Sequence, residues 1–331
     1  MNNVCFIRES NLFRVNDSFE YNPIIKVLDD YPPDRFSLLL LHNERKDYGE
    51  NSIYQVYVSP SKKRIGWIFP GQALFSNQHD YAEDQFFLRY AFVAFYKLFE
   101  INEDIEEEEL SKSVFLLIDF DNTSEITGFD INDYSISLFS YGYSFSGKGN
   151  MISSSVDYSS EKKINLKPFS SLLKTKEPFI QGLIKNHIPN SVDPISVFLL
   201  FYQLIELLIT IVFDDSFSSL LKEIKESENV DLMAKKEKLL ESLSEKKRIN
   251  ILFSNRSSVE SGNLNELGES CSSFLMHYKQ EVPAAIPERL YTVRSFLIHR
   301  GYMFDLYGME LIRGINSALC AVVVDLLLSF K

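Results

Sequence analysis

The chain has 331 residues, of which 45% are hydrophobic and 14% are aromatic. This composition excludes an intrinsically disordered protein, and the length allows two domains. The formal net charge of −12 excludes a surface coated for non-specific nucleic-acid binding, which needs clustered lysine and arginine, but it leaves room for a local basic cleft.

The cysteines are Cys5, Cys271 and Cys320, odd in number and widely separated. This spacing offers neither a disulfide framework nor a zinc-ligand pattern, and it suits a reducing compartment. The first residues lack a basic region followed by a long apolar core, so no secretory signal is predicted. We therefore expect a cytoplasmic protein whose function needs no cofactor and no metal ion.

The first 77 residues contain short aromatic and β-branched runs separated by turn-forming residues, which is typical of strands. Strands are predicted at residues 38–41, 52–58 and 65–69, and Trp67 is expected in their core. A long helix with a wide apolar surface is predicted over residues 80–99. The acidic stretch 103–109 is interpreted as a solvated connector.

Residues 114–119 form a short apolar run that predicts a buried strand. The stretch Phe115-Leu-Leu-Ile-Asp119-Phe-Asp121-Asn-Thr123 resembles the first motif of the haloacid dehalogenase family. The resemblance implies a magnesium-dependent phosphatase in which Asp119 attacks a phosphoryl group and Asp121 handles protons. The α/β alternation of such a fold is not apparent in the sequence, and a turn after a strand explains the same residues.

Residues 126–156 alternate again, with Ile136, Leu138 and Tyr141 at strand spacing and Gly142 as punctuation, so antiparallel strands are predicted. The glycine-containing stretch 146–150 lacks the spacing of a phosphate-binding loop, and a hairpin turn is expected there. Polar and charged residues follow at 159–167. They place the end of a β-rich domain at about residue 165.

Residues 166–331 have helical patterns, with helices predicted at 195–213, 216–247, 263–280, 287–300 and 303–330. Two stretches, 195–213 and 314–330, are apolar enough to be mistaken for membrane spans. They contain Gln203, Glu206 and Asp325 and lack basic flanking anchors. Buried helices of a bundle, without a membrane, are the preferred interpretation.

Two chemically capable side chains lie on the predicted helix that opens at Pro287 and stops at Gly301. Arg294 offers a forked cation that fits phosphate oxygens, and His299 offers an imidazole that exchanges protons near neutral pH. Residues five positions apart on an ideal helix are rotated by about 140°, so these side chains do not share a face. They converge within one chain only if the last turn unwinds at Gly301.

The stretch Arg294-Ser-Phe-Leu-Ile-His299 resembles the R-x(4–6)-H motif of the HEPN superfamily, all-α bundles many of which are metal-independent ribonucleases. A second stretch, Tyr202-Gln-Leu-Ile-Glu206, is similar to a pattern in the first long helix of HEPN domains from bacterial defence proteins. Arg35 and His42 satisfy the same spacing, but the apolar run between them predicts a strand.

The HEPN resemblance implies that Arg294 and His299 are catalytic and that the motifs of two copies face each other across a dimer. The arginine would stabilise charge on the phosphorane, and the histidine would move a proton. Ser295 and Arg300 are expected to support phosphate binding. Glu206 is expected to hold Arg294, because a carboxylate inside an apolar helix needs a partner.

We therefore expect an α+β protein with a β-rich sensing or regulatory domain at residues 1–165 and a HEPN-like bundle at residues 166–331. The predicted function is metal-independent cleavage of RNA by a homodimer. The resemblance implies a toxin or an abortive-infection effector, with a phage or regulatory trigger bound by the N-terminal domain. The alternatives are a non-catalytic HEPN-like dimerisation or interaction module and the magnesium-dependent phosphatase.

Overall fold

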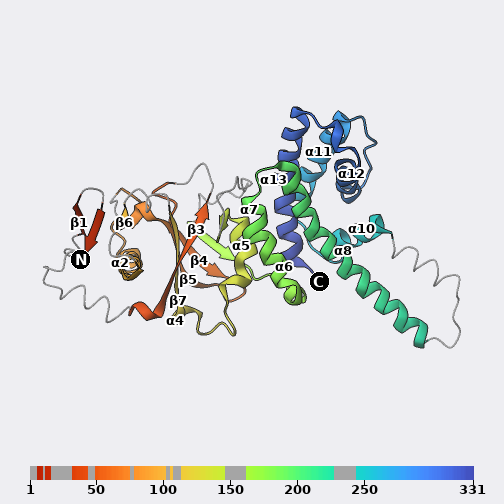
Figure 1. The fold of residues 1–331 in the computed structure, drawn as a ribbon. Coiled ribbons are helices and arrows are strands. Elements are labelled where there is room, and N and C mark those ends of the chain that lie inside the picture. The colour runs from red at the N-terminus through yellow and green to blue at the C-terminus, as the bar shows by residue number, and fades with distance from the viewer. Residues whose placement is uncertain are drawn as a thin grey trace. The chain divides into compact units, whose positions relative to one another are not determined.

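The computed structural model describes residues 6–9, 12–15, 32–43, 49–74, 78–101, 105–106, 113–145, 162–226 and 244–331. The chain divides into two compact units. The first comprises Met1–Gly147 and Ser155–Pro168, and the second comprises Lys148–Ser154 and Phe169–Lys331. The first unit contains the strands and the second is helical (Figure 1), so the predicted α+β class is confirmed.

A six-stranded mixed sheet organises the first unit, with the strand order β8-β3-β7-β5-β4-β9. Its strands are β3 Phe36–Asn43, β4 Tyr54–Val58, β5 Lys63–Pro70, β7 Val114–Asp119, β8 Tyr143–Ser144 and β9 Lys163–Leu166. All neighbouring strands are antiparallel except β4 and β9. A separate three-stranded sheet contains β1 Phe6–Glu9, β2 Leu12–Val15 and β6 Ile105–Glu106.

Strand β7 is buried on both of its faces, which explains its uninterrupted apolar sequence. Alternate side chains of a strand point to opposite faces. Val114, Leu116 and Ile118 therefore join one core cluster, while Phe115 and Leu117 join the other. The predicted buried strand at 114–119 is confirmed, and the reason is its place in the middle of the sheet.

Helix α2, Gln85–Ile101, supplies the second cluster with Phe87, Tyr90 and Val93. The predicted core position of Trp67 is confirmed, because its ring lies edge-on to Phe87 with centroids 5.3 Å apart. The helix begins five residues later than predicted. Asp84 explains this start, because its carboxylate accepts hydrogen bonds from the backbone N–H groups of the next turn.

The strands predicted over residues 126–156 are wrong for most of the described part of that stretch. The 3-10 helix η3, Ile131–Tyr134, leads into α5, Ser135–Ser140, and only β8 is extended. Asp130 starts the helical turn by accepting from the N–H of Asn132 at 2.9 Å. Gly142 ends it in the left-handed region at φ 77°. The expected hairpin turn at 146–150 lies outside the described residues.

The second unit is built from helices. Short elements come first: η4 Ser171–Lys176, α6 Glu177–Gly182, η5 Leu183–His187 and α7 Ile188–Asn190. The bundle follows with α8 Pro194–Glu226, α10 Glu245–Asn255, α11 Ser261–His277, α12 Ile286–Arg300, η6 Gly301–Met303 and α13 Leu306–Ser329 (Figure 1). Four predicted helices are confirmed by α8, α11, α12 and α13. The predicted separation between 195–213 and 216–247 is wrong, because α8 continues without a break to Glu226. The break expected at 227–229 lies outside the described residues.

Helices α8 and α13 are long and apolar enough to cross a membrane by length and composition. In the bundle α13 packs against α8 and α11, and α10 packs against α8. Buried residues make up 50% of the apolar window of α8 and 61% of that of α13. Packing inside the bundle accounts for much of their apolar character.

Gly66 tests the packing of the sheet, because a Cβ there would lie 1.8 Å from the carbonyl oxygen of Leu117 on β7. We expect Gly66→Ala to lower the free energy of unfolding by about 2–3 kcal/mol, since the neighbour is rigid backbone. Gly49→Ala is the control, with nothing within 4 Å of the added carbon, and should change stability by less than about 0.5 kcal/mol. Equal denaturation midpoints for the two variants would contradict the β5–β7 pairing.

Candidate functional site

Helix α12 carries the candidate catalytic residues. Pro287 occupies its first turn, and the helix ends at Arg300, one residue before Gly301 as predicted. Gly301 has right-handed backbone angles, φ −55° and ψ −22°, and leads into η6. The unwinding of the last turn that would let the two side chains converge is not found at His299; α12 ends one residue later, where Arg300 departs from helical angles at φ −131° and ψ 21°. Arg294 and His299 are therefore rotated by about 140° from each other, as on any regular helix.

Arg294 lies in a half-buried setting against α8. Its Nη2 donates to Glu206 Oε1 at 2.8 Å, and its guanidinium carbon lies 5.5 Å from the centroid of the Tyr202 ring. Burial lowers the pKa of Arg294, but the hydrogen bond and the charge of Glu206 outweigh that effect and leave the pKa raised. The expected contact between Glu206 and Arg294 is confirmed, and the guanidinium stays charged.

The ring of Tyr202 packs against the guanidinium of this ion pair. It is 1% exposed and stacks on Phe198, and its hydroxyl donates to Glu245 on α10 at 3.4 Å. Burial and the charge of Glu245 raise the pKa of Tyr202, so the hydroxyl remains a donor. The Nε of Arg294 is buried without a hydrogen-bond partner in the described part of the chain. One donor of the fork is thus unused.

His299 lies in different surroundings. It is exposed in the last turn of α12, and no hydrogen bond or ion pair joins its imidazole to a described residue. Ser295 is half-buried, and Arg300 is exposed and donates from Nη1 to Gln280 Oε1 at 3.2 Å. A single chain therefore holds the cation of the motif firmly and leaves the imidazole in solvent.

A histidine–carboxylate pair that the motif search did not single out lies at the same end of α12. His277, the last residue of α11, approaches Asp305, the N-cap of α13, with 3.0 Å between Nε2 and Oδ2. A helix-terminal histidine and an N-cap aspartate were visible in the sequence, but the 28 positions between them hid the contact.

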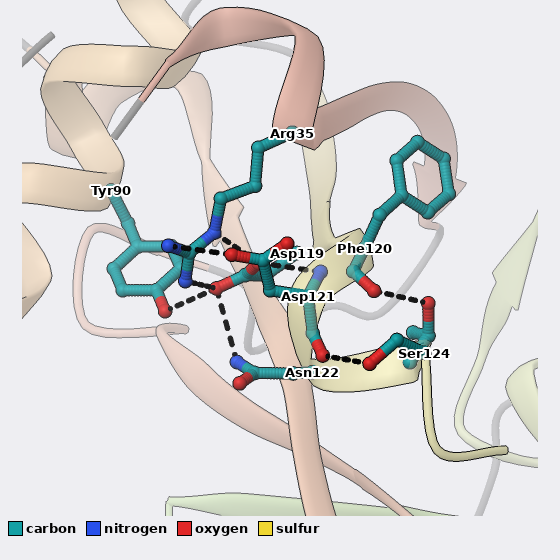
Figure 2. Close-up of polar contacts among 8 residues, drawn as sticks. Arg35, Tyr90, Asp119, Phe120, Asp121, Asn122 and Ser124 are labelled. Atoms are coloured by element: carbon teal, nitrogen blue, oxygen red, sulfur yellow. Dashed lines mark hydrogen bonds and ion pairs between the residues drawn. The ribbon is translucent and has the colours of Figure 1, made fainter. Parts of the chain in front are cut away.

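The aspartate of the phosphatase-like stretch is the centre of a buried network in the first unit (Figure 2). Arg35 binds it as a fork, with Nε 2.7 Å from Oδ1 and Nη2 2.6 Å from Oδ2 of Asp119. The Tyr90 hydroxyl donates to Oδ2 at 2.9 Å, the Asn122 amide donates to Oδ2 at 3.1 Å, and the Asp121 N–H donates to Oδ1 at 3.1 Å.

This network has the properties of a structural anchor. Asp119 is 0% exposed, and five donors occupy its two oxygens. Burial and the charge of Asp119 raise the pKa of Tyr90 to about 12, which keeps its hydroxyl protonated. A phosphoryl-accepting carboxylate needs a free oxygen facing its substrate. Among the described residues, no group of three or more His, Cys, Asp and Glu side chains is arranged to hold a metal ion.

Arg35 is the variant that tests the anchor. We expect Arg35→Met to lower the free energy of unfolding by about 3 kcal/mol or more, because it leaves a buried carboxylate without its counter-ion. Asp121→Asn is the matched control: this side chain is 66% exposed and also binds Arg35, so its loss should cost less than about 1 kcal/mol. Urea denaturation of the two variants measures the difference. Similar losses would show that Asp119 is not held as described.

No protein-family model matches the chain, and no match is found among curated proteins or solved structures. The residues that the structure does bring together are Arg294, Glu206 and Tyr202.

Proposed function

We propose that this protein is a metal-independent endoribonuclease that acts as a homodimer, with Arg294 and His299 as its catalytic residues. The observation that carries the proposal is the contact of Arg294 with Glu206 and Tyr202. These residues come from the two stretches that resemble HEPN domains. Arg294 and Glu206, which form the ion pair, are 88 positions apart in the chain. Contact between two independently recognised stretches is what a shared site requires.

Metal-independent cleavage of RNA needs three actions. The 2′-hydroxyl loses its proton and its oxygen bonds to phosphorus, the phosphorane carries extra negative charge, and the 5′-oxygen takes a proton as its bond to phosphorus breaks. The products are a 2′,3′-cyclic phosphate and a free 5′-hydroxyl. Arg294 serves the second action because it is a permanent cation that Glu206 holds in place. His299 serves one of the two proton transfers.

The proposal includes a second copy of the chain. On a regular α12 the imidazole of His299 is turned about 140° from the side chain of Arg294, so one helix cannot present both to the same phosphate without rearranging. Two helices related by a twofold axis present each residue twice. The Arg294 of one copy then meets the His299 of the other.

Exposed cations near the motif suit a phosphate ligand in spite of the net charge of −12. Arg300 extends from the end of α12 and is exposed, and Ser295 lies one residue after Arg294. Both are proposed to bind the backbone of the RNA. The regulatory role of the first unit, its phage or other trigger, and the place in toxin or anti-phage defence are proposals that rest on the resemblance. The cytoplasmic location is a proposal that rests on the few, widely separated cysteines.

A non-catalytic interaction module is the second candidate function. One observation favours it: large apolar side chains are exposed around the end of α12 and the start of α13. Their exposed fractions are 61% for Met276, 48% for Ile298, 47% for Met303, 88% for Leu306 and 60% for Tyr307. Such a surface suits a protein partner whether or not RNA is cleaved.

Cleavage of RNA in EDTA tests the proposal. We expect the wild-type protein to yield 2′,3′-cyclic phosphate ends, and both Arg294→Ala and His299→Ala to lower the cleavage rate about 10²-fold or more. His187→Ala is the control, because His187 is exposed in the same unit and lies outside the motif. The ion pair of Arg294 is partly exposed, so its loss should cost about 1 kcal/mol or less of stability.

Three outcomes decide between the candidates. Loss of cleavage in both motif variants with unchanged melting temperatures supports the nuclease. Wild-type cleavage that both variants retain removes Arg294 and His299 from the mechanism. A folded wild-type dimer that leaves RNA intact favours the interaction module.

A further inference from the structure

One end of the bundle gathers the C-terminal ends of α11 and α12 and the start of α13. Two hydrogen bonds tie these ends together: Arg300 donates to Gln280 at 3.2 Å, and His277 contacts Asp305 at 3.0 Å. Gln280 in turn donates from Nε2 to the carbonyl oxygen of Tyr278 at 2.8 Å. His277 and the exposed end of α12 therefore belong to one connected structure.

Asp305 is a fixed, ionised acceptor at this end. The backbone N–H of Gly308 donates to its Oδ1 at 2.6 Å, and the Tyr278 hydroxyl donates to the same oxygen at 3.1 Å. The hydrogen bond from Gly308, followed by the one from His277, lowers the pKa of Asp305. The group is therefore a carboxylate at neutral pH, and it can only accept hydrogen bonds.

This state of Asp305 fixes the tautomer of His277. Because the carboxylate accepts, Nε2 of His277 carries the proton of that hydrogen bond. In the neutral ring Nδ1 is then the unprotonated nitrogen. No described residue bonds to Nδ1, and the His277 side chain keeps 28% of its surface exposed. An imidazole oriented by a carboxylate, with its other nitrogen free to accept, is the arrangement of a general base.

Groups suited to a nucleic-acid substrate lie at the same end of the bundle as this imidazole. The Tyr307 ring lies edge-on to it with centroids 5.0 Å apart and is 60% exposed, so one face is open to a base. Arg300 is a cation matched to a phosphodiester, and the exposed His299 precedes it on α12. The Tyr278 ring is a second edge-on neighbour of the imidazole, with centroids 4.6 Å apart.

We propose that His277, oriented by Asp305, is the second proton-transfer residue of the ribonuclease site and takes the proton of the attacking 2′-hydroxyl. This inference rests on the proposed function and supplies the proton transfer that the motif pair leaves unassigned. Nδ1 of His277 takes the proton as the 2′-oxygen bonds to phosphorus. The imidazolium of His299 gives a proton to the 5′-oxygen as its bond to phosphorus breaks, so one histidine gains the proton that the other loses.

The test compares the RNA cleavage rates of His277→Gln and His187→Gln. His187 is an exposed histidine of the same unit. We expect His277→Gln to lower the single-turnover rate on RNA about 10²-fold or more, and His187→Gln to leave it unchanged. Binding of an uncleavable oligonucleotide with 2′-deoxyribose at the cleavage position should change less than about threefold in either variant, because the base acts on a proton and not on affinity.

The pH dependence gives a readout that a structural role would not move. A general base works only when unprotonated, so the wild-type rate should rise with pH on the acid side, and this rise should be lost in His277→Gln. The charged and titratable groups to consider around His277 are Asp305, Tyr278 and Tyr307, with His299 and Arg300 at the adjoining helix end. Asp305→Asn tests the positioning residue: it should lower the rate and shift the acid side of the profile.

Added imidazole keeps the test decisive if the variant is poorly stable. Recovery of cleavage by imidazole in His277→Ala supports proton transfer at this position, because imidazole supplies the missing base. Two results overturn the inference: a cleavage rate of His277→Gln within threefold of the wild-type rate, or a loss of cleavage in His277→Ala that added imidazole does not restore. When the His277 results overturn the inference while Arg294→Ala abolishes cleavage in the same assay, this inference alone fails. When the wild-type protein does not cleave RNA, the proposed function fails with it.

Discussion

The ion pair between Arg294 and Glu206 is the interaction on which the account of this protein depends. It joins α12 to α8, the long helix of the bundle, over the buried ring of Tyr202. The guanidinium is half-buried, and Glu206 supplies its counter-ion from the largely apolar α8, although the Glu206 side chain itself is 41% exposed. Because Glu206 engages one nitrogen of the fork, the pair fixes the position of Arg294 without using all of its donors.

Asp119 and Arg294 both lie in stretches that resemble catalytic motifs, but the contacts of Asp119 are those of a structural ion pair. Asp119 is fully buried, and the fork of Arg35, the hydroxyl of Tyr90 and two further donors saturate it. Strands β3 and β5 also run antiparallel to β7. Asp119 therefore holds the first turn after β7 to the rest of the first unit. The sequence around Asp119 resembles a phosphatase motif, but the hydrogen-bond partners of this carboxylate favour a structural role.

The sequence predicted those parts of the fold that depend on side-chain period and burial. Strand β7 was predicted because an apolar run of its length fits a strand buried on both faces, and the pairing of Glu206 with Arg294 followed from the need of a buried charge. Helix α5 was missed because Ile136 and Leu138 fit a strand as well as a helix; in the structure α5 continues directly from η3, whose N-cap is Asp130. The contacts of Asp119 with Arg35 and of His277 with Asp305 join residues 84 and 28 positions apart, which no local pattern reveals.

The central claim is that the Arg294 of one copy and the His299 of another act on the same phosphate. Mixing Arg294→Ala protein with His299→Ala protein, each inactive alone, tests this most directly. A dimer with one chain of each kind has one intact site, so random exchange of chains should restore about a quarter of the wild-type cleavage rate. A mixture that exchanges chains, as shown by tagged copies, and still leaves RNA intact would contradict the claim.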